Sequence, residues 1–369
     1  MAEKPRVIIL GGLGFVGRNL VCYLVENNLC SKIRAVDKVP PQTAWLNDRQ
    51  KEAFANSCVE FKSANLRNPG SVEKAFLDDG DFEFCFNCAG ETKYGQIKEV
   101  YEDGIYKLSI NCAKEAAKRN IKRYIELSTA QVYNCDKKEK EEESKLSPWT
   151  GLGQCKLMVE KELAKIEGLK YVIVRPAIIY GIGARQGITP RLIIGAVYKQ
   201  LKESMKLLWT KDLKMNTVHV YDVCQALWHL TDHGDDGEVY NLCDKADSSQ
   251  GSITSLVCEI FGIEHNYFGT VLSNLARVNM ESTVEESNEK HLAPWSQACE
   301  KDGIQATPLS PYLDQELLYD KHLFIDGTKI EKTGFAYKYA EPTVDALREI
   351  VQDYVKQGLF PPSLFNSSS

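Results

Sequence analysis

The sequence has no long apolar run and no marked excess of charge of one sign. Within its 369 residues, no hydrophobic stretch approaches the roughly 20 residues that a membrane-spanning helix needs. Its 45 lysine and arginine residues stand against 51 aspartate and glutamate residues, and the net charge of −6 gives no broad attraction for phosphate backbones. We therefore expect no membrane span and no nucleic-acid partner.

An export signal, a disulfide framework and a metal site are missing as well. Residues 1–6 lead into only four strongly apolar residues before the first glycine, which is too short and too acidic a start for a secretory signal. The 12 cysteines follow no regular spacing, which is typical of reduced thiols. Cys85 and Cys88 form a Cys-x-x-Cys pair, but no second Cys or His pair stands at the spacing of a zinc finger. We expect a cytoplasmic protein without a bound metal.

Short β-branched runs alternate with longer helical patterns in the first half of the chain, which predicts βαβ units and a parallel sheet. Runs such as Val7 to Leu10 lack polar alternation, as in strands that are covered on both faces. The predicted strands are 6–10, 33–37, 58–63, 82–87, 123–127 and 171–175. The predicted helices are 15–26, 71–76, 104–119 and 153–165.

Beyond residue 175 the pattern becomes irregular. A strand, a turn and a helix are expected over 217–230 and a strand over 239–242, whereas 251–318 mixes helical pieces with polar loops. The charged stretch 136–144 is interpreted as a solvated loop. The predicted units are 1–177 with 217–245 returning to it, a smaller discontinuous lobe made of 178–216 and 246–360, and a tail at 361–369.

A glycine-rich turn follows the first predicted strand and opens the first predicted helix. In Gly11-Gly-Leu-Gly14-Phe15-Val16-Gly17, Gly11 allows a tight turn, Gly14 lets the backbone approach a pyrophosphate and Gly17 lets helix and strand pack closely. The helix N-terminus offers free N–H groups to the phosphates.

An acidic residue, Asp37, ends the second strand 20 residues after Gly17, where a carboxylate accepts the two ribose hydroxyls. Because Asp37 repels a 2′-phosphate, NAD is favoured over NADP, although Lys38 partly offsets the repulsion. The sequence thus predicts an α/β fold, namely a Rossmann-type doubly wound parallel sheet with a smaller discontinuous C-terminal substrate lobe, and NAD as cofactor.

Several further segments, in chain order, resemble those of extended short-chain dehydrogenases/reductases of the NAD-dependent epimerase/dehydratase family, over roughly residues 5 to 360. The glycines are spaced Gly-x-x-Gly-x-x-Gly as in that family. The other segments are Asn65-Leu66, Asn87-Cys-Ala89-Gly90, Leu127-Ser-Thr129-Ala-Gln-Val-Tyr133, Arg175-Pro-Ala-Ile-Ile-Tyr180-Gly181 and Val218-His-Val-Tyr-Asp222-Val. The resemblance implies that Asn65 and Leu66 lie near the adenine and that Ala89 lies against the cofactor.

The resemblance also implies an active group made of a Ser/Thr hydroxyl, a tyrosine and a lysine. Tyrosine and lysine are spaced i, i+4 on one helical face, so the ammonium lowers the phenol pKa and also holds the nicotinamide ribose. Thr129 matches the hydroxyl residue and Lys156 the lysine. Leu152 stands at the position of the tyrosine, and no tyrosine lies between Tyr133 and Tyr171. Proton transfer, typically worth about 10²- to 10⁴-fold in rate, therefore lacks its usual carrier.

Two functions are compatible with a leucine at the position of the tyrosine. The first is an NAD-binding, epimerase/dehydratase-like protein with impaired or lost oxidoreductase chemistry, which acts by cofactor-dependent binding of a small molecule or a partner. The second is an active NAD-dependent oxidoreductase or epimerase on a nucleotide-sugar, a steroid or a small alcohol or carbonyl compound. In that case Tyr94, Tyr106 or Tyr133 reaches in from another element as the proton carrier.

Ligand contacts in the second lobe are less specific. Arg185, Arg191 and His219, with Lys214 behind them, are candidates, although Arg191 also fits a surface residue on a helix. The small-molecule ligand is unknown from the sequence. The resemblance allows a homodimer through the two long predicted helices, because many family members pair such helices from each subunit.

Overall fold

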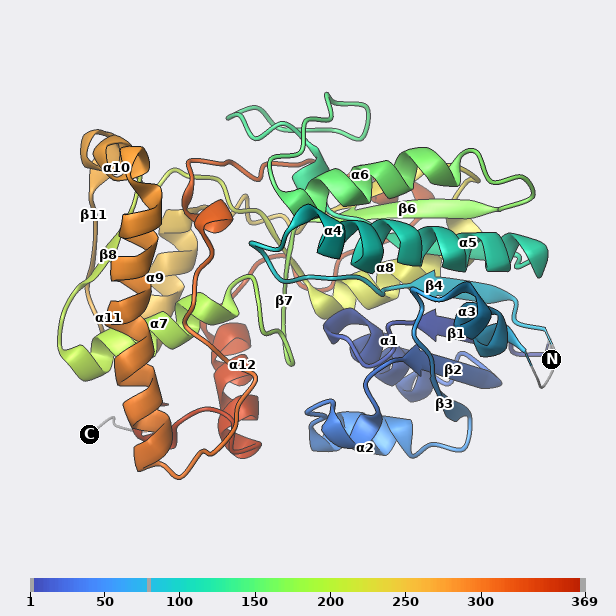
Figure 1. Ribbon diagram of the computed structural model, residues 1–369, viewed down its shortest axis with the longest axis horizontal. Helices are drawn as coiled ribbons and strands as arrows, with labels where there is room; N and C mark the ends of the chain where they lie inside the picture. The colour runs from blue at the N-terminus through green and yellow to red at the C-terminus, as the bar shows by residue number, and fades with distance from the viewer. Residues whose placement is uncertain (1–2, 78–80, 366–369) are drawn as a thin grey trace.

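A computed structural model describes residues 3–77 and 81–365, so the end of the predicted tail, 366–369, lies outside the described residues. Its centre is a seven-stranded sheet in the order β3-β2-β1-β4-β5-β6-β10, in which every neighbouring pair is parallel (Figure 1). The strands are β1 (Arg6–Leu10), β2 (Lys32–Asp37), β3 (Val59–Ser63), β4 (Phe84–Asn87), β5 (Arg123–Leu127), β6 (Tyr171–Pro176) and β10 (Val239–Leu242). The predicted Rossmann-type doubly wound sheet is confirmed.

Helices cover both faces of this sheet. Along β1, Val7 and Ile9 pack into the cluster that includes α1 and α8, whereas Ile8 and Leu10 pack into the cluster that includes α3, α5 and α6. This alternation explains why the strand sequence shows no polar face. The helices around the sheet are α1 (Phe15–Glu26), α2 (Asp48–Phe54), α3 (Pro69–Phe76), α4 (Lys98–Tyr101), α5 (Leu108–Lys118), α6 (Gly151–Leu163) and α8 (Val220–His233).

A second group of helices lies at the other end of the molecule (Figure 1). These are α7 (Thr189–Leu201), α9 (Gln250–Phe261), α10 (Gly269–Val278), α11 (Met280–Lys301), α12 (Val344–Lys356) and α13 (Pro362–Phe365). Their core includes Leu192, Val257, Trp295 and Leu347. The sequence predicted scattered helical pieces here, whereas α11 is one continuous helix of 22 residues. Its polar sequence hides the narrow apolar stripe that packs on α7.

Short strands and turns connect the two groups. Two small parallel sheets pair β7 (Ile178–Tyr180) with β9 (Thr217–His219) and β8 (Met205–Leu207) with β11 (His265–Tyr267). The 3₁₀ turns are η1 (Pro41–Thr43), η3 (Ala130–Val132), η4 (Gln315–Leu318) and η5 (Lys329–Thr333). The predicted division of the chain into two units stays a prediction.

The predicted helix 104–119 is two elements, because a π-helical turn, η2 (Glu102–Lys107), precedes α5. The Gly104 carbonyl in this turn accepts the N–H of Glu91, which follows β4, at 3.0 Å. A Cβ on Gly104 would lie 3.0 Å from that of Glu91. The wider turn therefore brings the helix backbone against the chain leaving β4, a contact that sequence periodicity does not reveal.

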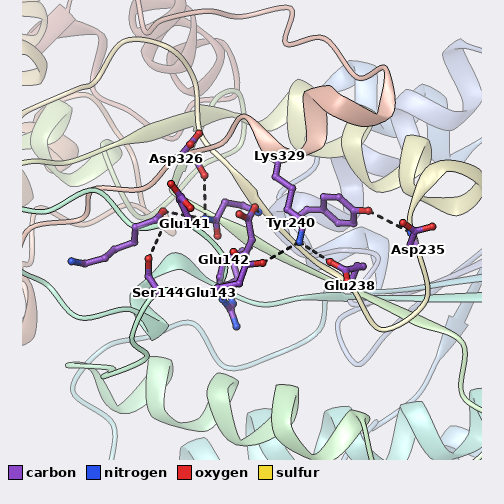
Figure 2. Close-up of polar contacts among 12 residues, drawn as sticks. Glu141, Glu142, Glu143, Ser144, Asp235, Glu238, Tyr240, Asp326 and Lys329 are labelled. Carbon is purple, nitrogen blue, oxygen red and sulfur yellow. Dashed lines mark hydrogen bonds and ion pairs between the residues drawn. The ribbon is translucent and has the colours of Figure 1, made fainter.

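The charged stretch 136–144 is a loop, but two of its side chains are not solvated as predicted. Lys140 is 7% and Glu142 is 9% exposed. Glu142 accepts the backbone N–H of Asn241 on β10 at 2.8 Å, and Figure 2 shows Lys329 between Glu143 and Glu238. Because β10 is an edge strand, the loop satisfies polar groups that an open sheet edge leaves unpaired.

Candidate dinucleotide site

The glycine turn between β1 and α1 has the geometry that its sequence predicts. The N–H groups of Gly11 and Gly12 both donate to the Val36 carbonyl on β2, at 2.8 and 3.0 Å. Gly11 has a φ of +77°, a conformation that favours glycine. A Cβ on Gly17 would lie 2.1 Å from the Gly11 carbonyl oxygen, and one on Gly14 3.2 Å from the same atom. The turn therefore has no room for larger side chains.

The first turn of α1 leaves its N–H groups available. Gly14 is the N-cap, it provides no side-chain cap, and the N–H of Arg18 donates to the Gly14 carbonyl at 3.0 Å. The N–H groups of Phe15, Val16 and Gly17 precede that first intrahelical bond and have no acceptor within the helix. Such a helix start is suited to phosphate oxygens.

Asp37 lies beside this turn. Its Oδ2 atom accepts the N–H of Leu13 and its Oδ1 atom accepts the N–H of Val39, both at 3.1 Å. The two bonds hold the half-buried carboxylate against the glycine turn, while Lys38 is exposed. A carboxylate has about four acceptor sites, so two remain for ligand hydroxyls.

The other predicted cofactor residues follow β3 and β4. Ala89 packs against the turn, since a Cβ on Gly11 would lie 2.7 Å from the Ala89 backbone nitrogen. Exposed Asn65 accepts the N–H of Arg67 at 3.2 Å, whereas the Leu66 side chain is buried in the core and faces away from the surface. β1 lies between β2 and β4, so the strand order reverses direction there. In open α/β sheets, ligands bind beside the carboxyl ends of the strands at such a reversal.

Thr129 and Lys156 are held at the same end of the sheet. Thr129 follows β5, and its Oγ1 accepts the N–H of Gln131 at 3.2 Å. Lys156, on α6, is 8% exposed and donates to Glu126 at 3.0 Å and to the Leu127 carbonyl at 2.5 Å. Sequence reasoning did not single out Glu126. A glutamate within an otherwise apolar strand was the signal that could have found it.

Leu152 offers no proton to this site. It is 9% exposed and belongs to the core cluster that includes Tyr101 and Val159. Cys155, the nearest reactive side chain along α6, is 4% exposed, and burial raises the pKa of its thiol. Tyr106 packs against the same core cluster, and its hydroxyl makes no hydrogen bond within the described part of the chain.

Of the other candidate tyrosines, Tyr133 is structural. Its hydroxyl accepts from Arg175 at 2.7 Å and donates to Asn241 at 2.8 Å, and burial raises its pKa to about 12. Tyr94 is different, because its hydroxyl accepts from Gln131 Nε2 at 2.7 Å, two residues beyond Thr129. Burial raises the Tyr94 pKa to about 12. The phenol therefore stays protonated near neutral pH.

The same glutamine ties Tyr94 to the start of α6. Gln131 Oε1 accepts the hydroxyl proton of Thr150, the N-cap of that helix, at 2.9 Å. Gly151, next along the helix, donates its N–H to Glu316 at 2.9 Å. Tyr94 thus lies at the end of α6 that carries Leu152, a neighbourhood that sequence spacing did not reveal.

The candidate ligand contacts of the second lobe have few charged partners. Arg191 is half-buried, unlike a surface arginine, and its nearest polar atoms are Met215 Sδ at 3.4 Å and Gln250 Oε1 at 3.5 Å. Burial lowers the Arg191 pKa to about 10. Arg185 donates to the Ala44 carbonyl at 3.1 Å.

His219 and Lys214 have other roles. The His219 ring stacks on Tyr339 at 3.8 Å between centroids, and burial lowers its pKa to about 4. Lys214 forms an ion pair with Asp247. Both side chains therefore have partners within the protein, and their role as ligand contacts stays a prediction.

The parallel sheet, the glycine turn and the carboxylate on the neighbouring strand define a Rossmann-type dinucleotide-binding protein. A sequence profile of the NAD dependent epimerase/dehydratase family matches residues 7–243, and the chain belongs to this family. The cofactor of this family agrees with the predicted NAD. The residues present fit that cofactor, because Gly11 and Gly17 have no room for a Cβ, the start of α1 has no side-chain cap, and the Asp37 carboxylate lies beside the turn.

The individual relatives of known activity share little sequence identity with this chain. The chain is 27% identical over 168 residues, 44% of its length, to the bifunctional UDP-glucose 4-epimerase and UDP-xylose 4-epimerase 1 of Pisum sativum. The chain spans about half of that relative's length (47%). A ketoreductase of Stigmatella aurantiaca that acts on 4-hydroxy-2-methyl-3-oxo-4-farnesyl-3,4-dihydroquinoline-1-oxide is 25% identical over 279 residues, covering 70% of this chain and 74% of the relative.

Among solved structures, UDP-N-acetylglucosamine 4-epimerase from Methanobrevibacter ruminantium has a TM-score of 0.69 at 17% identity, covering 96% of this chain and 100% of that one. At this identity the likeness shows the fold alone. Within residues 3–77 and 81–365, no helix combines the length and apolar character needed to cross a membrane. The predicted cytoplasmic location and homodimer stay predictions.

Proposed function

We propose that this chain is an NAD(H)-binding protein whose oxidoreductase chemistry is impaired, and that it acts by binding a small molecule or a partner in a cofactor-dependent way. One contrast carries the proposal: the glycine turn and Asp37 are in place, whereas Leu152, four residues before Lys156, is buried in the core. The parts that would hold a dinucleotide are present, and the usual proton carrier is absent.

The glycine turn, Asp37, Lys156 and Thr129 would hold the cofactor and its ligand. Gly11, Gly14 and Gly17 shape the turn, the first N–H groups of α1 would donate to the phosphates, and Asp37 would accept ribose hydroxyls with its two remaining acceptor sites. NAD, when bound, supplies a hydride acceptor. Lys156 would donate to the nicotinamide ribose, and the Thr129 hydroxyl would hydrogen-bond a ligand oxygen.

A ligand cleft at the carboxyl ends of the strands completes this proposal. Arg191 supports it, because a half-buried guanidinium whose hydrogen-bond partners are Met215 and Gln250, with no carboxylate among the described residues, keeps its charge for an anionic group of a ligand. A nucleotide-sugar offers such a group through its diphosphate, and the Pisum sativum relative is named for acting on UDP-sugars.

The second candidate is a working oxidoreductase or epimerase, and the position of Tyr94 favours it. Its phenol is hydrogen-bonded to Gln131, next to the loop that carries Thr129. In this role Tyr94 would hand its own proton to a substrate oxygen and recover it from solvent. Its raised pKa suits an acid and disfavours a base.

Binding and turnover separate the two candidates. NADH fluorescence titration of the purified protein should give saturable binding. Panels of UDP-sugars, steroids and alcohols with NAD should give little NADH, carbonyl compounds with NADH should give little NADH consumption, and chromatography should show little epimerisation of the UDP-sugars. A Tyr94→Phe variant should leave NADH binding unchanged. Brisk turnover that Tyr94→Phe abolishes would establish the second candidate, whereas no NADH binding at millimolar concentration would overturn both.

A further inference from the structure

Glu126 is the centre of a buried polar network behind the predicted cofactor crevice. It lies on β5 and is fully buried. Four side chains donate to its carboxylate: Lys156 at 3.0 Å and Ser109 at 3.2 Å to Oε1, and Asn87 at 2.6 Å and Tyr124 at 3.0 Å to Oε2. All four acceptor sites of the carboxylate are therefore used.

The Lys156 ammonium is directed by the same network. Of its three N–H donors, one reaches Glu126 and one the Leu127 carbonyl at 2.5 Å. The third remains for a ligand. A Cβ on Gly90 would lie 4.0 Å from the Lys156 nitrogen, so the ammonium reaches the chain that leaves β4. That chain follows β4, at the point where the strand order reverses and where such sheets bind their ligands.

The charges of Glu126 and Lys156 balance each other. The other titratable groups that face it are Tyr124 on β5, Cys85 and Cys88 on and after β4, and Cys112 on α5. Burial raises the pKa of each, so they stay protonated and neutral. Along α6, Glu160 is paired with Arg175 at 2.6 Å, so it does not compete for the ammonium.

We propose that Glu126 is a positioning residue that neutralises the Lys156 ammonium and directs it to hold the cofactor rather than to ionise a neighbouring hydroxyl. This inference rests on the proposed function, because it explains how a cofactor site is kept while acid–base chemistry is suppressed. A lone ammonium favours a nearby phenolate, whereas an ammonium already paired with a carboxylate gives little net field.

The test compares NADH affinity across pH in variants of this pair. In the Glu126→Gln variant the buried ammonium has no counter-charge and loses its proton more readily, so NADH binding should weaken at least ~5-fold between about pH 7 and pH 9. Wild-type affinity should stay flat over that range. Lys156→Met should bind NADH weakly at every pH. Glu73→Gln, which opens the exposed Glu73–Lys118 pair, is the matched control and should behave as wild type.

A double variant keeps the inference falsifiable if Glu126→Gln folds poorly. Replacing the pair by apolar residues, Glu126→Leu with Lys156→Met, leaves no lone buried charge and should fold. If Glu126 acts through Lys156, the double variant binds NADH within about 2-fold of Lys156→Met alone, with no pH dependence. A pH dependence that persists without Lys156 overturns the inference.

A second readout does not depend on NADH. The ¹³Cε NMR signal of Lys156, assigned by its loss in Lys156→Met, should change more with pH over about pH 7–9.5 in Glu126→Gln than in wild type, because the variant lacks the counter-charge. Identical titration in both proteins refutes the role of Glu126. Absence of NADH binding by the wild type, with this NMR difference present, rejects the proposed function but leaves the charge coupling established.

Discussion

Replacing Asp37 is the most direct perturbation of the predicted cofactor site. Each of its carboxylate oxygens already accepts one backbone N–H, from Leu13 and from Val39, at 3.1 Å. The two remaining acceptor sites are those available to ribose hydroxyls. Asp37→Ala removes all of them, and Asp37→Asn keeps one oxygen acceptor without the charge.

The size of the effect follows from those two sites. A hydrogen bond to a charged group contributes roughly 1.5–3 kcal/mol, and water replaces part of the loss, so about 2–3 kcal/mol of NADH binding should disappear in Asp37→Ala. This corresponds to a roughly 30- to 150-fold rise in Kd. The NADH Kd of Asp37→Asn should fall between that of Asp37→Ala and that of the wild type. Asp37→Ala should also lower the free energy of unfolding by about 1–3 kcal/mol, because the N–H groups of Leu13 and Val39 lose their acceptor.

NADH fluorescence titration gives the Kd values, and urea unfolding followed by circular dichroism shows that each variant is folded. Asp345→Ala is a suitable control, because the Asp345 side chain is 87% exposed and forms an ion pair with Arg348 on the same helix, α12. The preference for NADH over NADPH should also narrow in Asp37→Ala, because the repulsion of a 2′-phosphate is gone. An NADH Kd unchanged in Asp37→Ala, or raised equally in Asp345→Ala, would refute the reasoning.

Three further predictions concern chemistry and stability. Leu152→Tyr should raise any residual NADH production by about 10-fold. This is less than the usual, roughly 10²- to 10⁴-fold effect of acid–base catalysis, because Lys156 stays paired with Glu126. An unchanged rate of NADH production would contradict this prediction. Arg175→Met leaves the Glu160 carboxylate buried without its ion-pair partner and should lower the free energy of unfolding in urea by about 3–5 kcal/mol. Removing the exposed ion pair between Arg49 and Glu26 should lower it by less than about 1 kcal/mol. Burial raises the Asp244 pKa from 3.8 to about 7, so the folded state binds the proton more tightly, and stability should fall as pH rises from 3.8 to about 7. Asp244→Asn should flatten that part of the stability profile, and an unaltered slope would show that Asp244 is not its source.

The main sheet and the glycine turn could be predicted from the sequence because both depend on local patterns. Buried parallel strands need continuous apolar runs, and a turn in which a Cβ would lie 2.1 Å from a carbonyl needs glycine at position 17. Asp37 could be placed for a similar reason, since the end of β2 must lie next to the end of β1. The absence of a tyrosine at position 152 was visible in the sequence alone.

Other features depend on contacts between residues far apart in the chain, and spacing does not encode these. The burial of Lys140 and Glu142 arises because their loop covers the edge strand β10, and α11 is stabilised by packing on α7. Leu66, expected near the adenine, is directed into the core by the turn after β3.

The sequence by itself therefore determined the class of fold, the glycine turn and the leucine at position 152, because each is recorded in residues that are neighbours along a strand, turn or helix. Only the tertiary structure decided what surrounds Lys156. Glu126 and Lys156 are 30 residues apart, and the burial that makes their pairing strong exists only when β5 and α6 pack together.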